Sequence, residues 1–270
     1  MSPSSFRPLG RRAGALAAAL VALLLALALP AHAGRACAAR MPDVASVQRG
    51  LALAEQAARA LDDSGAKVVV LARAGQDLSR YGLRWSHLGL AYRDGTVWRV
   101  VHKLNECGSG RADLFRQGLG EFFLDDMFEY RAAFVVLAPV LQERLLALLR
   151  DDARAAVLHE PAYNMVAYPW ARRYQQSNQW AIETIAFVES PEARSRDKAQ
   201  AWLQLSGFEP AVLRITAMTR LGARMTAANI AFDDHPNEKR FSDRIETVSV
   251  ESVFRWLSRR GLSGPVQVTP

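Results

Sequence analysis

Cysteine is scarce in this chain and is missing from its second half. Cys37 and Cys107 are the two cysteines among 270 residues, so none lies between 108 and 270. This distribution excludes a scaffold held by several disulfides and a thiol nucleophile in the C-terminal half. The HExxH, P-loop, GxSxG and dinucleotide-binding patterns are missing too, which excludes the enzyme classes that those motifs define. No cofactor is therefore predicted.

Basic residues form no dense cluster. The formal net charge is +7, but the arginines and lysines are spread along the chain without interleaved aromatic residues. A nucleic-acid partner would need a concentrated basic surface, so none is expected.

Long hydrophobic runs are limited to one, near the start. Three arginines precede the apolar run over 15–29, a proline ends it, and Ala31-His32-Ala33 follows. This is the order of a secretory signal peptide, and about 15 residues fall short of the roughly 20 that span a bilayer. We predict that residues 1–33 are a cleaved signal peptide and that 34–270 is periplasmic or secreted, with no stable membrane span after cleavage. The open alternative is an uncleaved membrane anchor.

The two cysteines favour a single disulfide in an oxidising compartment. A bond between Cys37 and Cys107 would close a loop of about 70 residues and stabilise the fold by about 4 kcal/mol at most. The alternative is that one cysteine is a nucleophile. Cys107 lies in a turn-like segment after a strand, not at a helix start where a thiolate is stabilised.

Hydrophobic periodicity predicts a single α+β domain over 34–270, an antiparallel sheet packed with helices. Residues 233–242 are expected to be a polar loop and 263–270 a frayed end. Strands are predicted at 67–72, 84–92, 96–104, 132–138 and 245–250, and helices at 41–61, 139–149, 177–189, 191–205, 210–228 and 251–260.

Two histidines are predicted to share one face of a hairpin. Asp94-Gly95 separates two strand-like runs, and Asp-Gly is a strong hairpin signal. With these residues at the centre of the turn, His87 lies directly opposite His102. Gly89 is on the same face, and because it has no side chain it leaves room beside the histidines. Such a pair is suited to a base and its orienting group, or to two metal ligands, or to simple packing in the sheet.

A second candidate is the helix start at Ser177, where Ser177 or Asn178 is a natural N-cap. A hydroxyl there has backbone N–H groups nearby for an oxyanion, although an ordinary cap needs no such role. Two acidic segments are weaker candidates: Asp125-Asp126 as a helix cap or as ligands, and Asp233-Asp234-His235-Pro236 as a divalent-cation site or a solvated turn.

Several blocks of the sequence resemble a family of exported bacterial proteins known as a domain of unknown function. The resemblance covers nearly all of the mature chain and brings no established activity. Its blocks are Gly75-Gln76-Asp77-Leu78, Tyr81-Gly82-Leu83-Arg84-Trp85-Ser86-His87-Leu88-Gly89, Val101-His102-Lys103-Leu104-Asn105-Glu106-Cys107-Gly108, Phe122-Phe123-Leu124-Asp125-Asp126, Tyr163-Asn164-Met165-Val166-Ala167-Tyr168-Pro169, Ser177-Asn178-Gln179-Trp180 and 229–236.

A more distant resemblance is to permuted NlpC-type papain-like hydrolases. The segment Ser86-His87-Leu88-Gly89-Leu90 is similar to the histidine strand of those enzymes, which is followed by a second polar residue and then by a helix that begins with cysteine. This chain has Ser177 or Asn178 where that cysteine is expected. The resemblance implies a papain-like fold, while the absent thiol keeps cysteine chemistry from being transferred.

Three functions follow as hypotheses. The first is an envelope hydrolase acting on an amide or ester, with Ser177 as nucleophile, His87 as base and His102 as orienter. The second is a catalytically inactive binding or assembly module of the cell envelope. The third is a metal site formed by His87, His102 and one of Asp125, Asp126 or His235. A cell-envelope peptide, a lipid or a protein is the expected partner.

Overall fold

The computed structural model describes residues 43–125 and 127–269. They form a single α+β domain built around a six-stranded antiparallel sheet, as the sequence predicts. The predicted signal peptide, Cys37 and Asp126 lie outside these residues. Along the sheet, the strands are β4 (Ala112–Gly118), β3 (Val97–Asn105), β2 (His87–Asp94), β1 (Val68–Ala74), β5 (Glu129–Val136) and β8 (Gln267–Thr269).

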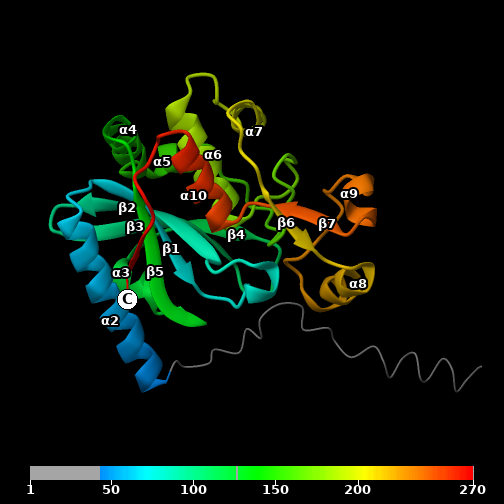
Figure 1. The fold of residues 1–270 in the computed structure, drawn as a ribbon, viewed down its shortest axis with the longest axis horizontal. Helices are drawn as coiled ribbons and strands as arrows, with labels where there is room; N and C mark the ends of the chain where they lie inside the picture. Colours follow the sequence, from blue (N-terminus) through cyan, green and yellow to red (C-terminus); the bar gives the residue numbers. More distant parts are fainter. Residues whose placement is uncertain (1–42, 126, 270) are drawn as a thin grey trace, which may run out of the picture. The chain divides into compact units, whose positions relative to one another are not determined.

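Helices cover both faces of this sheet (Figure 1). One face packs on α2 (Val44–Asp63) and α3 (Leu119–Phe123) through a cluster centred on Phe122 and Phe123. The other face carries a larger cluster that includes Leu88, Leu90 and Trp180. The helices on that side are α4 (Pro139–Leu149), α5 (Asp152–Ala155), α6 (Ser177–Glu189), α7 (Arg196–Leu205) and α10 (Val250–Arg259).

A smaller structural unit is inserted between α7 and α10. It consists of the antiparallel ribbon of β6 (Ala211–Arg214) and β7 (Arg244–Thr247) with the helices α8 (Ala217–Thr226) and α9 (Asn237–Phe241). Its core joins Val166, Leu213 and Phe232 to half-buried side chains near η1 (Ser79–Tyr81). Among the described helices, none is long and apolar enough to cross a membrane.

The conformation predicted for three segments was wrong. The helix predicted over 210–228 is the strand β6 followed by α8, and the loop 233–242 contains α9. The end predicted to fray is β8, whose Thr269 hydroxyl accepts a hydrogen bond from Ala132 N at 3.2 Å. In each case, tertiary pairing or packing decides the conformation of a segment whose local pattern is ambiguous.

Candidate functional site

The two histidines form a hydrogen-bonded pair. Nε2 of His87 lies 2.8 Å from Nδ1 of His102, and Nε2 of His102 lies 2.7 Å from Oε1 of Gln117 on β4. The two rings meet edge to face, with centroids 5.1 Å apart. The prediction that they share one face of the hairpin is confirmed.

The register of the hairpin differs from the prediction. Asp94 pairs with Val97 and Leu90 with Val101, so the central residues of the turn are Gly95 and Thr96. Gly95 has φ +60°, which suits glycine. The shift is two residues, and an even shift keeps side chains on the same face, so the histidines meet diagonally instead of directly.

Gly89 makes room for this contact. A Cβ atom built on Gly89 would lie 2.5 Å from Val100 Cγ1 and 3.1 Å from His102 Cβ. A side chain at Gly89 would therefore displace the neighbouring strand or the ring of His102. The expectation that Gly89 allows close approach beside the histidines is confirmed.

The histidine pair lies in an apolar and cationic environment. Phe122 contacts both rings, and His102 has no exposed surface. Burial, and then the charge of Arg73, lowers the pKa of His102 to about 4 and holds the pKa of His87 well below its usual value. Both rings are therefore neutral near pH 7, which suits a proton relay or a buried polar contact.

Ser177 is placed differently from the prediction. The N-cap of α6 is Gln176, whose Oε1 accepts a hydrogen bond from Asn178 N at 2.6 Å, so Ser177 is the first residue inside the helix. Its hydroxyl interacts with that of Tyr163, whose pKa is raised by burial and lowered in part by this interaction.

No hydrogen bond joins Ser177 to His87 or His102 among the described residues. The hydrogen bonds of the rings go to each other and to Gln117. The rings also pack against Phe122 on one side of the sheet, whereas the buried face of α6 belongs to the cluster on the other side. The structure thus brings the two histidines together without bringing Ser177 into contact with them.

The groups considered as metal ligands have other partners. Asp125 forms an ion pair with Arg73, while His235 is held by Asp234 at 3.0 Å and by the Glu246 carbonyl at 2.9 Å. Within 43–125 and 127–269, no three His, Cys, Asp or Glu residues are grouped as a metal site would require. Asp126 lies outside these ranges.

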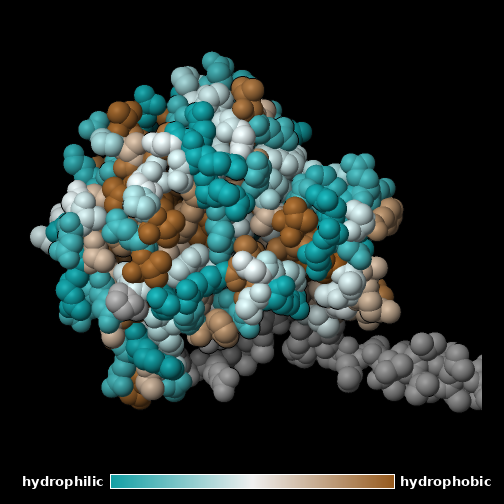
Figure 2. Space-filling view, viewed as in Figure 1, coloured by the Kyte–Doolittle hydropathy of each residue, from teal (hydrophilic) through white to brown (hydrophobic). Residues whose placement is uncertain are grey.

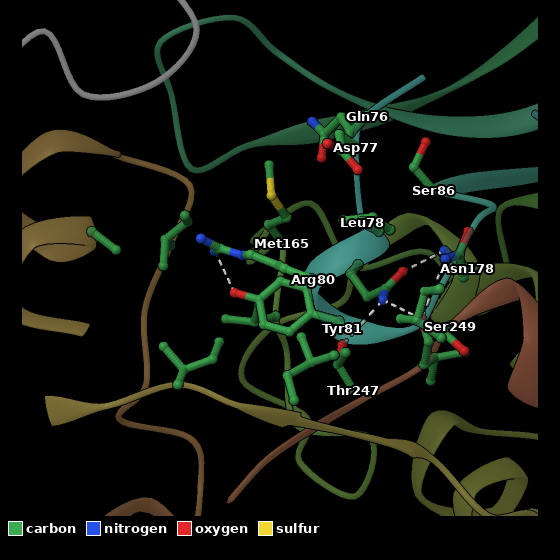
Figure 3. Close-up of a pocket in the computed structure, with 18 of the residues that line it drawn as sticks. Gln76, Asp77, Leu78, Arg80, Tyr81, Ser86, Met165, Asn178, Thr247 and Ser249 are labelled. Carbon is green, nitrogen blue, oxygen red and sulfur yellow. Dashed lines mark hydrogen bonds between the residues drawn. The ribbon is translucent and has the colours of Figure 1, made fainter. Parts of the chain in front are cut away.

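Sequence reasoning missed a cavity of about 460 Å³ beside the start of α6 (Figure 3). Its walls come from the segment before β2, the loop before α6, the inserted unit and the start of α10. A volume of this size is within the range of small-molecule sites. The residues that line the cavity include Tyr81, Leu83, Met165, Asn178, Ala223, Ile230 and Ser249.

One side of the cavity is apolar. Tyr81, Leu83, Ala223 and Ile230 pack against the core cluster of the inserted unit, are only partly buried, and line this space. Apolar surface left uncovered inside a protein favours an apolar ligand, since filling the space removes that surface from water.

The opposite side carries amide and hydroxyl groups from two helix starts. Asn178 Oδ1 accepts a hydrogen bond from Leu88 N at 3.0 Å, and its Nδ2 donates to the Val248 carbonyl at 3.2 Å. Ser249, the N-cap of α10, accepts a hydrogen bond from Ser252 N. Figure 3 shows Asn178 and Ser249 near each other at this side. Each retains a proton that can be donated to a ligand.

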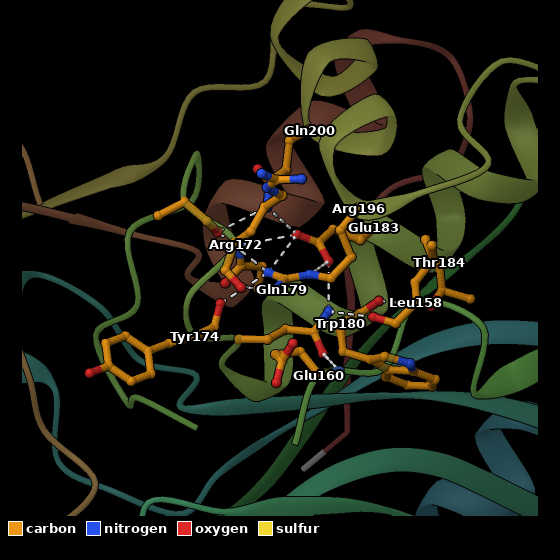
Figure 4. Close-up of polar contacts among 12 residues, drawn as sticks. Leu158, Glu160, Arg172, Tyr174, Gln179, Trp180, Glu183, Thr184, Arg196 and Gln200 are labelled. Atoms are coloured by element: carbon orange, nitrogen blue, oxygen red, sulfur yellow. Dashed lines mark hydrogen bonds and ion pairs between the residues drawn. The ribbon is translucent and has the colours of Figure 1, made fainter. Parts of the chain in front are cut away.

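A buried carboxylate fixes α6 in place (Figure 4). Glu183 has no exposed surface and forms an ion pair with Arg196, whose Nε lies 2.9 Å away. It also accepts hydrogen bonds from the amides of Gln175, Gln179 and Gln200. Because both oxygens of the Glu183 carboxylate are paired, the network holds α6 in place and positions the polar side of the cavity.

A lysine is buried next to this network. Lys103 has no exposed surface, and its Nζ donates to Gln175 Oε1 at 2.9 Å and to the Glu160 carbonyl. Burial, and then the charge of Arg196, lowers the pKa of Lys103 to about 7. This burial has no local signal, because alternation places Lys103 on the face opposite His102 but does not report what covers that face.

The fold and the cavity define a single-domain α+β protein with a pocket lined by the inserted unit, the segment before β2 and the starts of α6 and α10. The chain belongs to the family described as uncharacterized proteins conserved in bacteria (DUF2145), which matches residues 60–257. This confirms the predicted family of unknown function. No curated protein and no solved structure matches the chain. Five of the blocks that carried the resemblance contribute residues to the cavity wall, among them Gln76, Tyr81, Met165, Asn178 and Ile230.

Proposed function

We propose that the protein is an exported binding module whose cavity takes a small, mainly apolar ligand bearing a hydrogen-bond acceptor. The observation that carries this proposal is the partly buried apolar wall formed by Tyr81, Leu83, Ala223 and Ile230. A cavity of this volume satisfies the size requirement, and Asn178 and Ser249 supply donors for a carbonyl or amide. A lipid-derived molecule or an apolar peptide segment fits this description.

Titration with a dansyl-labelled fatty amide tests the proposal. Saturable enhancement of fluorescence is expected with the purified protein. Ala223→Trp fills the cavity from α8 and should weaken binding at least about tenfold, because the ligand loses most of its apolar contact. Gly222→Trp is the matched control: Gly222 is exposed and does not line the cavity, and a Cβ there meets no atom within 4 Å.

Two results would overturn this function. One is the lack of saturable binding by the wild-type protein. The other is equal affinity of the Ala223→Trp and wild-type proteins for the probe, which would place the probe elsewhere.

The hydrolase of the first hypothesis is the alternative function, and the observation that favours it is the hydrogen-bonded His87–His102 pair. The hydrolase requires the Ser177 hydroxyl to break its interaction with Tyr163 and to approach a ring nitrogen of His87. A general base takes a proton only from a donor within about 3 Å. Labelling by a fluorophosphonate that is lost in Ser177→Ala would favour the hydrolase over the binding module. The papain-like cleft implied by the distant resemblance stays a prediction, for the binding module as well as for the hydrolase.

Export is part of the proposal. It is supported by the signal-peptide pattern over 1–33. N-terminal sequencing of the protein from a periplasmic fraction should begin at Gly34. The mass of the protein should be lower than that of the reduced chain by two hydrogen atoms if Cys37 and Cys107 form a disulfide. An intact N-terminus in the cytoplasmic fraction would contradict export.

A further inference from the structure

The outward face of α8 exposes an apolar stripe. Met218, Leu221 and Met225 are 77%, 57% and 64% exposed, and their spacing places them on one side of the helix. Hydrophobic side chains also reach the surface of the inserted unit in Figure 2. Single exposed apolar residues are ordinary, but three in register on one short helix indicate an interaction surface.

This face cannot turn inward, because α8 is fixed from its other side. Arg220 is buried, donates to the Ile215 carbonyl and forms an ion pair with Asp243 at 2.6 Å. Thr219 and Ala223 line the cavity. The stripe therefore stays exposed while the inner face of the same helix closes the pocket.

Two arginines at the end of the β6–β7 ribbon that leads into α8 have no acidic partner in the described part of the chain. Arg214 and Arg244 are exposed cross-strand partners in the β6–β7 ribbon, and Arg214 lies just before α8. Across the described ranges, neither forms an ion pair with an acidic group. Like charges placed directly opposite each other are unfavourable, so an anionic partner that neutralises both would be stabilised.

We propose that α8 and this end of the β6–β7 ribbon dock on an anionic lipid surface. The stripe would enter the boundary between headgroups and acyl chains, and Arg214 and Arg244 would contact the phosphate headgroups. The combination of an apolar helix face with adjacent basic residues is the chemistry of interfacial binding. Docking goes beyond ligand binding, and it places the wall of the cavity formed by α8 at the membrane surface.

Co-sedimentation with vesicles tests the proposal. The protein should bind vesicles of phosphatidylcholine and phosphatidylglycerol and bind pure phosphatidylcholine much more weakly. The double variant Arg214→Gln, Arg244→Gln should bind about 25-fold more weakly, from roughly 1 kcal/mol per basic residue at an anionic surface. The control Arg150→Gln, Arg154→Gln removes the same charge elsewhere and should bind like the wild type.

The apolar contribution has its own variants. Replacing Met218, Leu221 and Met225 together by serine should abolish sedimentation, whereas Leu205→Ser removes an 81% exposed leucine from α7 and should have no effect. In the wild-type protein, anionic vesicles should protect Met218 and Met225 from oxidation by peroxide. This last measurement needs no variant to fold.

The outcomes are distinct. Equal binding to neutral vesicles, unchanged binding of the serine variant, or methionines protected by a co-purifying protein but not by vesicles would each overturn the proposal. Ala223→Trp should retain vesicle binding while losing the dansyl probe, so failure of the docking surface and failure of the cavity can be told apart.

Discussion

Protonation of the histidine pair should destabilise the fold in acid. His102 has no exposed surface and a pKa of about 4, compared with about 6.5 in the unfolded chain. Below pH 6.5 the unfolded chain therefore binds a proton that the folded protein does not. Stability is lost as the pH falls from 6.5 toward 4, and it is retained above pH 6.5.

The size of this effect follows from the shift in pKa. The contribution of His102 to the free energy of unfolding should fall by about 2 kcal/mol at pH 5 and by about 3 kcal/mol at pH 4, relative to pH 7. His87 acts in the same direction, because burial also lowers its pKa. Carboxylates elsewhere titrate over the same range, so the effect of His102 has to be isolated by substitution.

Urea denaturation of the wild-type protein and of His102→Gln at pH 7, 6, 5 and 4 makes that comparison. The variant loses the hydrogen-bonded ring and should be less stable at pH 7. The gap should narrow as the pH falls, because glutamine does not take up the proton. The double variant with His87→Gln should be flatter still. A gap that stays constant from pH 7 to pH 4 would refute the buried, neutral state of His102.

Three further predictions concern the titration of Lys103, the packing at Gly89 and the capping of α6. Relative to Lys103→Met, the wild-type protein should gain about 2 kcal/mol between pH 7 and pH 9, because the unfolded lysine keeps its proton in that range; parallel urea-unfolding profiles would contradict this. Gly89→Ala should cost about 1–3 kcal/mol in urea denaturation because its Cβ meets Val100, whereas Gly120→Ala makes an ordinary 3.6 Å contact and should cost less than 1 kcal/mol. Gln176→Ala removes the cap of α6 and two contacts with the segment before α10, and its thermal midpoint should fall by an amount equivalent to about 1–2 kcal/mol.

Local patterns were sufficient for the histidine pair and much of the main sheet. Alternation along a strand has a period of two, so His87 and His102 share a face for any even error in register. The error arose at the turn, where Asp94 continues the ladder and Gly95 takes the positive φ. Pro139 at the start of α4 was equally informative, because proline suits the first turn of a helix.

The cavity and the inserted unit required tertiary information. The wall joins residues as distant as Tyr81 and Ile230, and no local pattern reports that they meet. Residues 211–214 have a spacing compatible with a helix, and their pairing with 244–247 makes them a strand. The cap of α6 is a glutamine, which is outside the usual set of capping residues and left Ser177 as the better sequence candidate.

The last strand has a consequence for handling the protein. β8 is three residues long and forms the outer edge of the sheet beside β5. Short edge strands limit the sideways association of sheets from different molecules. A chain truncated before residue 267 would leave backbone N–H and C=O groups of β5 unpaired, and it should aggregate at concentrations at which the intact protein stays dispersed.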